Sequence, residues 1–289
     1  MLQTTSLKRK IVQNLVFTMF NASAMLNGVI LAIIIYFMIT NGLKAISIDF
    51  LIKPPTDSMT KGGILPCIMG TFYLCAITIM TALPIGVASA IYLNEYATRG
   101  KLIRVIRMGI NNLAGVPSIV FGLFGFAFFC IVLNIGVSML AGGLTLGVMT
   151  LPVIIASSEE ALKTVPDSYR QASLAMGATK WQTIYKIVLP AAFPGIITGA
   201  ILGLSRAAGE TAPIMYTGAV FFSPQMPNSP FDAVMALPYH IYVLATAGTN
   251  IAETRHLQYG TALVLIALVF TMNLMAIIIR SRIRKKIKT

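Results

Sequence analysis

The stretch QASLAMGATKWQTIYKIVLP, residues 171–190, stands between two apolar segments and decides how the rest of the chain is organised. Glycine suits the left-handed residue that ends a helix, so Gly177 is expected to divide the stretch in two. Thr179 and Gln182 have the spacing of a capping box, which begins a second helix. Apolar and small residues recur at helical spacing on both sides of the glycine. These two faces comprise Tyr169, Ala172, Ser173 and Met176, then Trp181, Ile184, Tyr185 and Val188. We therefore expect a bent pair of amphipathic helices, shaped to dock into another protein.

The composition places this stretch in a membrane protein. Of the 289 residues, 56% are hydrophobic and 11% are charged, which excludes an ordinary soluble domain. Apolar stretches long enough to cross a hydrocarbon core of about 30 Å fall at residues 15–40, 64–92, 108–133, 137–155, 191–216 and 259–279. The sequence thus predicts an all-α membrane protein with six transmembrane helices.

The 22 Lys and Arg residues are distributed unevenly. If the N-terminus is cytosolic, most of them fall in the inner segments, and the outer loops hold only Lys44, Lys53, Lys61 and Arg255. This asymmetry is the positive-inside pattern, which predicts that both termini and residues 171–190 face the cytosol. The basic tail, residues 281–289, is then expected to lie near anionic membrane lipid, and a nucleic-acid partner is not expected.

Missing motifs narrow the function further. Cys67, Cys75 and Cys130 lie in apolar segments without metal-ligand spacing, so we expect buried free thiols and no metal site. The sequence contains no G-x-x-x-x-G-K-[ST] phosphate loop, and no set of nucleophile and base can be assembled from it. We expect a chain that is not an enzyme, needs no cofactor and takes any ATP hydrolysis from a partner.

Outer loops and prolines are expected to shape the bundle. The first outer loop, 41–63, reads as irregular, and the third, 217–258, is long enough to contain short helices and holds both histidines. Four prolines fall within apolar segments, where they kink helices. They are Pro66, Pro84, Pro117 and Pro152.

The apolar segment 191–216 combines small residues with charge. Small residues recur every fourth position and form a seam along which another helix can approach closely. The seam consists of Gly195, Gly199, Gly203 and Ala207. Arg206 and Glu210 flank it and could pair as i, i+4 neighbours. An ion at bilayer depth costs about 2.5–3.5 kcal/mol, so two interpretations stand: the two charges belong to the pathway of an anionic solute, or they form a structural pair that fixes helix register.

Polar residues also open the segment 108–133. Asn111 and Asn112 precede the motif GVPSIVFGLFGF, which contains Ser118 and three glycines that permit close packing. Asn111 and Ser118 either line a polar path or hold neighbouring helices together through hydrogen bonds.

Residues 171–190 resemble the cytoplasmic loop of ABC importer permeases, whose pattern is E-A-A, three residues, G, nine residues, I-x-L-P. The matching positions, which the resemblance implies are ATPase-coupling residues, are Gln171, Ala172, Ser173, Gly177, Ile187, Leu189 and Pro190. Two of the three triplet positions depart from the pattern, and Gln171 removes a charge. The stretches NNLAGVPSIVFGLFGF (111–126) and GLSRAAGETAPIMYTGA (203–219) narrow the resemblance to phosphate-uptake permeases of the PstA type.

This resemblance covers residues 62–280 and implies a type I ABC importer permease (MetI-like) fold. It implies a permease domain at 62–280 with a coupling segment at 159–190, preceded at 1–61 by a tail, the first span and the first outer loop. The expected protein lies in a bacterial-type inner membrane and moves phosphate by alternating access. It is expected to pair with a homologous second permease, two ATP-binding subunits and an extracytoplasmic phosphate-binding protein. Three alternatives remain: a permease for another oxyanion such as molybdate or sulfate, a gradient-driven secondary transporter, and a nonconducting scaffold.

Overall fold

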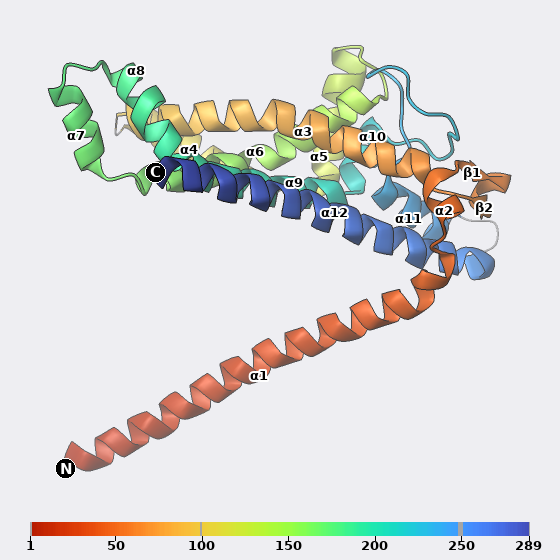
Figure 1. The fold of residues 1–289 in the computed structure, drawn as a ribbon, viewed down its shortest axis with the longest axis horizontal. Coiled ribbons are helices and arrows are strands. Elements are labelled where there is room, and N and C mark those ends of the chain that lie inside the picture. The colour runs from red at the N-terminus through yellow and green to blue at the C-terminus, as the bar shows by residue number, and fades with distance from the viewer. Residues whose placement is uncertain (1, 99, 248–250, 289) are drawn as a thin grey trace.

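The fold is a bundle of long helices with one helix standing away from it (Figure 1). It is described from a computed structural model that covers residues 2–98, 100–247 and 251–288. The elements in chain order are α1 (Leu2–Gly42), η1 (Leu43–Ala45), α2 (Ile48–Ile52), β1 (Pro55–Thr56), η2 (Asp57–Met59), β2 (Lys61–Gly62), α3 (Leu65–Ile91), η3 (Tyr92–Tyr96), α4 (Lys101–Leu113), α5 (Ser118–Gly125), η4 (Phe126–Val132), α6 (Met139–Lys163), α7 (Asp167–Ala175), α8 (Lys180–Thr183), η5 (Ile184–Val188), α9 (Leu189–Gly209), α10 (Ala212–Thr217), α11 (Leu237–Thr246) and α12 (Ile251–Lys288).

Helix α6 is the centre of the bundle, because it packs against α3 on one side and α9 on another. Small residues make this close packing possible: Gly143 lies against the side chain of Ile77 on α3, and Gly195 lies against Ala161 from the α9 side. Helix α12 packs against α9 and α11. The α7–α8 element lies at one end of the bundle and the β1–β2 hairpin at the other (Figure 1).

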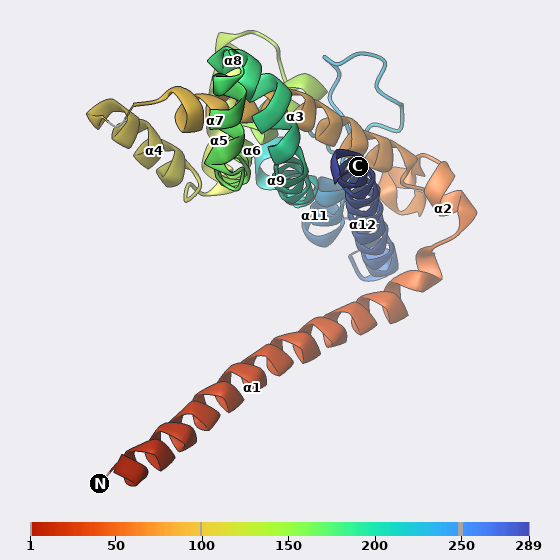
Figure 2. The same ribbon diagram turned by 60° about the vertical axis from the view of Figure 1, so that its left-hand side comes forward.

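Helix α1 leaves the bundle at a sharp angle and is exposed along its described side chains from Arg9 to Tyr36 (Figures 1 and 2). Near its C-terminal end it contacts α12. There, Phe37 packs edge-to-face on Tyr259 with ring centroids 5.5 Å apart. A Cβ atom on Gly42 would lie 2.8 Å from the backbone of Tyr259, so the two helices touch at this point.

Among the described residues, five helices are long and apolar enough to cross a membrane. Helix α4 and the α5–η4 segment pass the same test together and give a sixth candidate span. The predicted class, an all-α membrane protein, is therefore confirmed, and the count of six spans is met when α4 and the α5–η4 segment are taken as one broken span. The prediction for the third span is wrong in its geometry. Instead of one helix at 108–133, α4 and the α5–η4 segment meet at an angle of 105°. The cause is Pro117, which lacks a backbone donor and holds an extended conformation directly before α5.

Two further boundaries differ from the sequence prediction. The span predicted at 191–216 ends at Gly209, because Glu210 adopts an extended backbone and the separate helix α10 begins at Ala212, with Pro213 in its first turn. The outer loop predicted at 217–258 is shorter, since α12 already begins at Ile251. The expected short helix in that loop is confirmed as α11.

The first outer segment, 41–63, contains α2 and the small β1–β2 hairpin. The prediction that the three cysteines are buried free thiols is also confirmed. Pro84 and Pro152 lie inside α3 and α6, as the apolar segments predicted. No group of three or more metal-ligating side chains occurs among the described residues.

Candidate functional site

The bent helix pair predicted at residues 171–190 is present. Helix α7 ends at Ala175, and Gly177 turns the chain with a φ of 82°, in the left-handed region that favours glycine. Helix α8 begins with the expected capping box. The backbone N–H of Gln182 donates to Thr179 Oγ1 at 3.2 Å, and the backbone N–H of Thr179 donates to Gln182 Oε1 at 2.9 Å. The chain then continues through η5 into α9, so this element is continuous with a membrane-spanning helix.

A buried hydroxyl pair fixes the angle between the two short helices. Ser173 Oγ on α7 and Thr183 Oγ1 on α8 lie 2.8 Å apart, and both residues are buried. Buried polar groups are costly unless they are paired. This contact therefore selects one relative position of α7 and α8.

An apolar groove of about 390 Å³ lies between α7 and η5. Its lining residues are Tyr169, Ala172, Ser173, Met176, Ala178 and Ile187. Met176 is 88% exposed, and Trp181 stacks on Tyr185 with both rings exposed. Exposed apolar side chains that gather on one surface are typical of a docking site. Of the other matched positions, Gln171 and Pro190 are exposed and Leu189 is partly buried at the start of α9.

Arg170 anchors the element to the bundle. Its guanidinium donates to Glu95 Oε1 at 2.7 Å and Oε2 at 3.3 Å, and to the carbonyl oxygens of Val165 at 2.7 Å and Leu162 at 3.0 Å. Only 17% of its side chain and 8% of that of Glu95 are exposed. The hydrogen bond with Glu95 raises the pKa of Arg170 above the ordinary value for arginine. The carboxylate of Asp167 lies 3.2 Å away on the solvent side.

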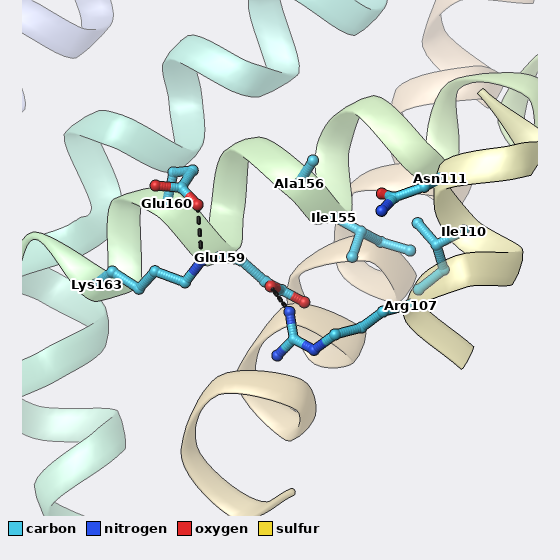
Figure 3. Close-up of a pocket in the computed structure, with 8 residues that line it drawn as sticks. All are labelled: Arg107, Ile110, Asn111, Ile155, Ala156, Glu159, Glu160 and Lys163. Carbon is cyan, nitrogen blue, oxygen red and sulfur yellow. Dashed lines mark hydrogen bonds and ion pairs between the residues drawn. The ribbon is translucent and has the colours of Figure 1, made fainter. Parts of the chain in front are cut away.

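A second arginine closes a pocket between α4 and α6 (Figure 3). The pocket has a volume of about 230 Å³. It is lined by Arg107, Ile110, Asn111, Ile155, Ala156, Glu159, Glu160 and Lys163. Arg107 reaches from α4 to form an ion pair with the buried carboxylate of Glu159 on α6, and it also donates to the carbonyl of Leu93 at 2.9 Å.

The sequence alone does not identify the two ion pairs, Arg170 with Glu95 and Arg107 with Glu159, as a site. Arg107 and Arg170 contribute to the sequence analysis only as two of the basic residues that indicate the topology. A usable signal was present, because the chain has only nine acidic residues, and Glu95 and Glu159 fall at the ends of apolar segments. Acids placed there in so apolar a chain call for a partner.

The structure separates the polar residues predicted to line a path. Asn111 is exposed at the end of α4 and lines the pocket beside Arg107, whereas Ser118 lies partly exposed at the start of α5, beyond the bend. Asn111 and Asn112 lie in the last turn of α4, just before the bend that separates α4 from α5.

Arg206 and Glu210 form the i, i+4 contact that their spacing permits. Arg206 Nε lies 3.4 Å from Glu210 Oε1, and the two side chains are 42% and 19% exposed. Gly203, one turn earlier, lies against Thr150 and Ile154 in the middle of α6. Arg206 is therefore near the centre of the bundle's length, on a face of α9 that is exposed in the isolated chain.

The small-residue seam of α9 faces α6. Gly195 lies against Ala161, Gly199 against Ser157 and Gly203 against Ile154, so the two helices run antiparallel with matched spacing. Ala207 is buried in the same core cluster as Leu146 and Met149 on α6. Arg206 lies in the last turn of α9, beside this seam, and Glu210 is the residue at which α9 ends.

Six potential spans, a bent helix pair at one end and charges within the bundle define a helical membrane transport protein. The chain belongs to the family of binding-protein-dependent transport system inner membrane components, whose profile matches residues 82–289. It is therefore a multi-pass permease component of an ABC importer, and the resemblance noted from residues 171–190 is confirmed.

Relatives are similar over most of the chain. A probable ABC transporter permease protein YqgI of Bacillus subtilis is 32% identical and is aligned over 97% of this chain and 99% of its own length. The phosphate transport system permease protein PstA 1 of Mycobacterium tuberculosis is 41% identical over 221 residues, which cover 76% of this chain and 71% of the relative. PstA of Mycobacterium leprae is 36% identical, with 94% and 90% covered.

Solved structures with the same fold are more distant in sequence. A chain of the inward-facing methionine ABC transporter MetNI superposes with a TM-score of 0.57 at 23% identity, covering 76% of this chain and 94% of that chain. A chain of a bacterial ABC transporter that imports the polysaccharide alginate gives a TM-score of 0.62 at 14% identity, covering 89% and 95%. At these identities the likeness establishes the fold alone.

Proposed function

We propose that this chain is the permease subunit of an ATP-driven importer of inorganic phosphate. The observation that carries the proposal is its 41% identity over 221 residues with a permease named for phosphate transport. A second phosphate permease, from Mycobacterium leprae, is 36% identical over 94% of this chain. Solute selectivity is expected to rest mainly on an extracytoplasmic phosphate-binding protein that delivers the anion.

In this proposal the α7–α8 element couples the permease to a cytosolic ATPase. The support is its apolar groove, its exposed Met176 and Trp181, and the Ser173–Thr183 contact that keeps it in one shape. The groove residues and the exposed Gln171 would meet an ATP-binding subunit. Two such subunits would serve this chain and a homologous second permease. Basic residues concentrated at the inner segments favour a cytosolic position for this element and for both termini.

The pathway would run along the exposed face of α9. Arg206 is 42% exposed there, and a guanidinium suits a phosphate oxyanion because it donates charge-assisted hydrogen bonds. Glu210 would hold the arginine until the anion arrives. Asn111 and Ser118, on the two sides of the Pro117 bend, would line the inner and outer parts of the same path, which opens to each side in turn.

Uptake measurements test the solute directly. A strain lacking the gene for this chain is compared with the same strain complemented by it, and uptake of radiolabelled phosphate, sulfate and molybdate is measured. We expect the deletion to lower phosphate uptake alone and complementation to restore it. Loss of sulfate or molybdate uptake with unchanged phosphate uptake would assign the permease to another oxyanion.

A further inference from the structure

The turn that follows α3 is bound by two arginines from different helices, α4 and α7. Residues 92–96 form η3, which is a π-helical turn, as η4 and η5 also are. Such turns are often found at functional sites. Arg170 of α7 binds the carboxylate of Glu95 in this turn, and Arg107 of α4 binds the carbonyl of Leu93. The turn thus joins the bent helix pair to α4.

The Arg170 contact is rigid. The guanidinium uses both oxygens of Glu95 and two carbonyls at the end of α6, at distances of 2.7–3.3 Å. Its planar fork fixes direction as well as distance. Asn94 Nδ2 also donates to Glu95 Oε1 at 2.8 Å. Because both charges are largely buried, separating them would leave an unpaired ion in the interior.

A second contact joins η3 to the other short helix. Lys180 Nζ at the start of α8 lies 4.8 Å from the centre of the Tyr96 ring, within the range of a cation–π interaction. Both halves of the bent pair therefore touch the same turn. A displacement of the pair is expected to move η3 with it.

Helix α4 is attached to η3 and α6 through Arg107. All its residues are described, and none of them is buried. Its charged anchor is the Arg107 guanidinium, which is shared between Glu159 on α6 and the Leu93 carbonyl of η3. A shift of η3 relative to α6 would pull this guanidinium in one direction or the other. Helix α4, which carries Asn111 at the pocket edge, would then change its angle.

We propose that the Arg170–Glu95 pair is the joint through which motion of the α7–α8 element reaches α4 by way of η3. Arg170 and Glu95 are then positioning residues for coupling, and neither touches solute or ATP. The inference rests on the proposed function, since it assumes that an ATPase moves this element. A route of this kind requires evidence of energetic coupling between its members, which double variants supply.

The test uses the complete importer reconstituted in vesicles, with the variants Arg170→Gln, Glu95→Gln and the double variant. The measured quantity is phosphate imported per ATP hydrolysed. Each single variant is expected to lower this ratio on the order of tenfold while ATP hydrolysis continues, and the double variant is expected to fall no further. Arg170→Lys keeps the charge without the fork and should give an intermediate ratio. Lys53→Gln, which removes an exposed ion pair with Asp49, is the matched control and should leave the ratio unchanged.

A second readout does not depend on the solute. A fluorescent probe is attached at Gly109→Cys on α4, where an added Cβ atom meets no neighbouring atom within 4 Å. The three native cysteines of this chain are buried. ATP should change the emission of the probe in the wild-type complex and not in Arg170→Gln or Glu95→Gln. The proposed role of the Arg170–Glu95 pair would be refuted if the ATP response persists in both variants. It would also be refuted if the losses in phosphate imported per ATP add up in the double variant. A wild-type complex that imports no phosphate but shows the probe response would instead refute the proposed solute.

Discussion

The close contact between α9 and α6 predicts that replacing a seam glycine by alanine changes stability by an amount that depends on the position. A Cβ atom at Gly199 would lie 2.5 Å from Ser157 Cβ and closer still to its Oγ. The Cβ atom cannot swing away, and rotating Oγ would break its hydrogen bonds to Val153 at 2.8 Å and Ile154 at 3.1 Å. At Gly203 the nearest atom is Ile154 Cγ1 at 3.3 Å, so a small shift of that side chain relieves the contact.

The expected magnitude follows from two opposing terms. Replacing glycine by alanine inside a helix stabilises by roughly 0.5–1 kcal/mol, whereas overpacking a close contact costs about 1–3 kcal/mol. Gly199→Ala should therefore destabilise by about 2 kcal/mol, because its clash involves a Cβ atom that cannot move. Gly203→Ala should be neutral or stabilising by up to about 1 kcal/mol, because only the stabilising term applies in full.

Thermal unfolding of the purified complex measures this difference. At about 2–4 °C per kcal/mol for a chain of this size, Gly199→Ala should lower the midpoint by about 4–8 °C. Adding Ser157→Gly removes the opposing atoms and should recover most of the loss. A Gly199→Ala midpoint at or above wild type, or an equal fall for Gly203→Ala, would refute the reasoning about the seam.

Two further substitutions test the coupling element and the pathway. Gly177→Val places a β-branched residue at a φ of 82°, which costs about 1–3 kcal/mol of local strain. Because this strain distorts the turn between α7 and α8, ATP hydrolysis should continue while uptake falls. Asparagine tolerates this backbone conformation, so Gly177→Asn should retain coupling. Equal uptake by Gly177→Val and Gly177→Asn would speak against a role for the turn. Neutralising Arg206→Gln together with Glu210→Gln should abolish uptake with little change in the unfolding midpoint. Uptake at the wild-type rate would make their contact a purely structural pair.

Local features could be predicted from the sequence because their causes lie within a few residues. Gly177 is needed by its own backbone conformation, and the capping box joins Thr179 to Gln182. The α9 seam repeats every four residues, so its spacing alone indicates a close helix contact.

Features that depend on distant residues could not be predicted. Arg170 and Glu95 are 75 positions apart, and Arg107 and Glu159 are 52 apart, so nothing local indicates which charges pair. The sequence predicts a kink at Pro117 inside one span, because hydropathy averages over the proline and cannot show whether the helix bends or breaks. Helix α4 is the result of that break.

The most direct test of the account is phosphate accumulation by vesicles that contain the complete importer, with binding protein and phosphate on one side and ATP on the other. Ionophores that collapse proton and sodium gradients are added to half of the samples. We predict accumulation that requires hydrolysable ATP and is the same with and without ionophores. Accumulation that ionophores abolish, or that proceeds without ATP, would contradict an ATP-driven permease and indicate a gradient-driven transporter.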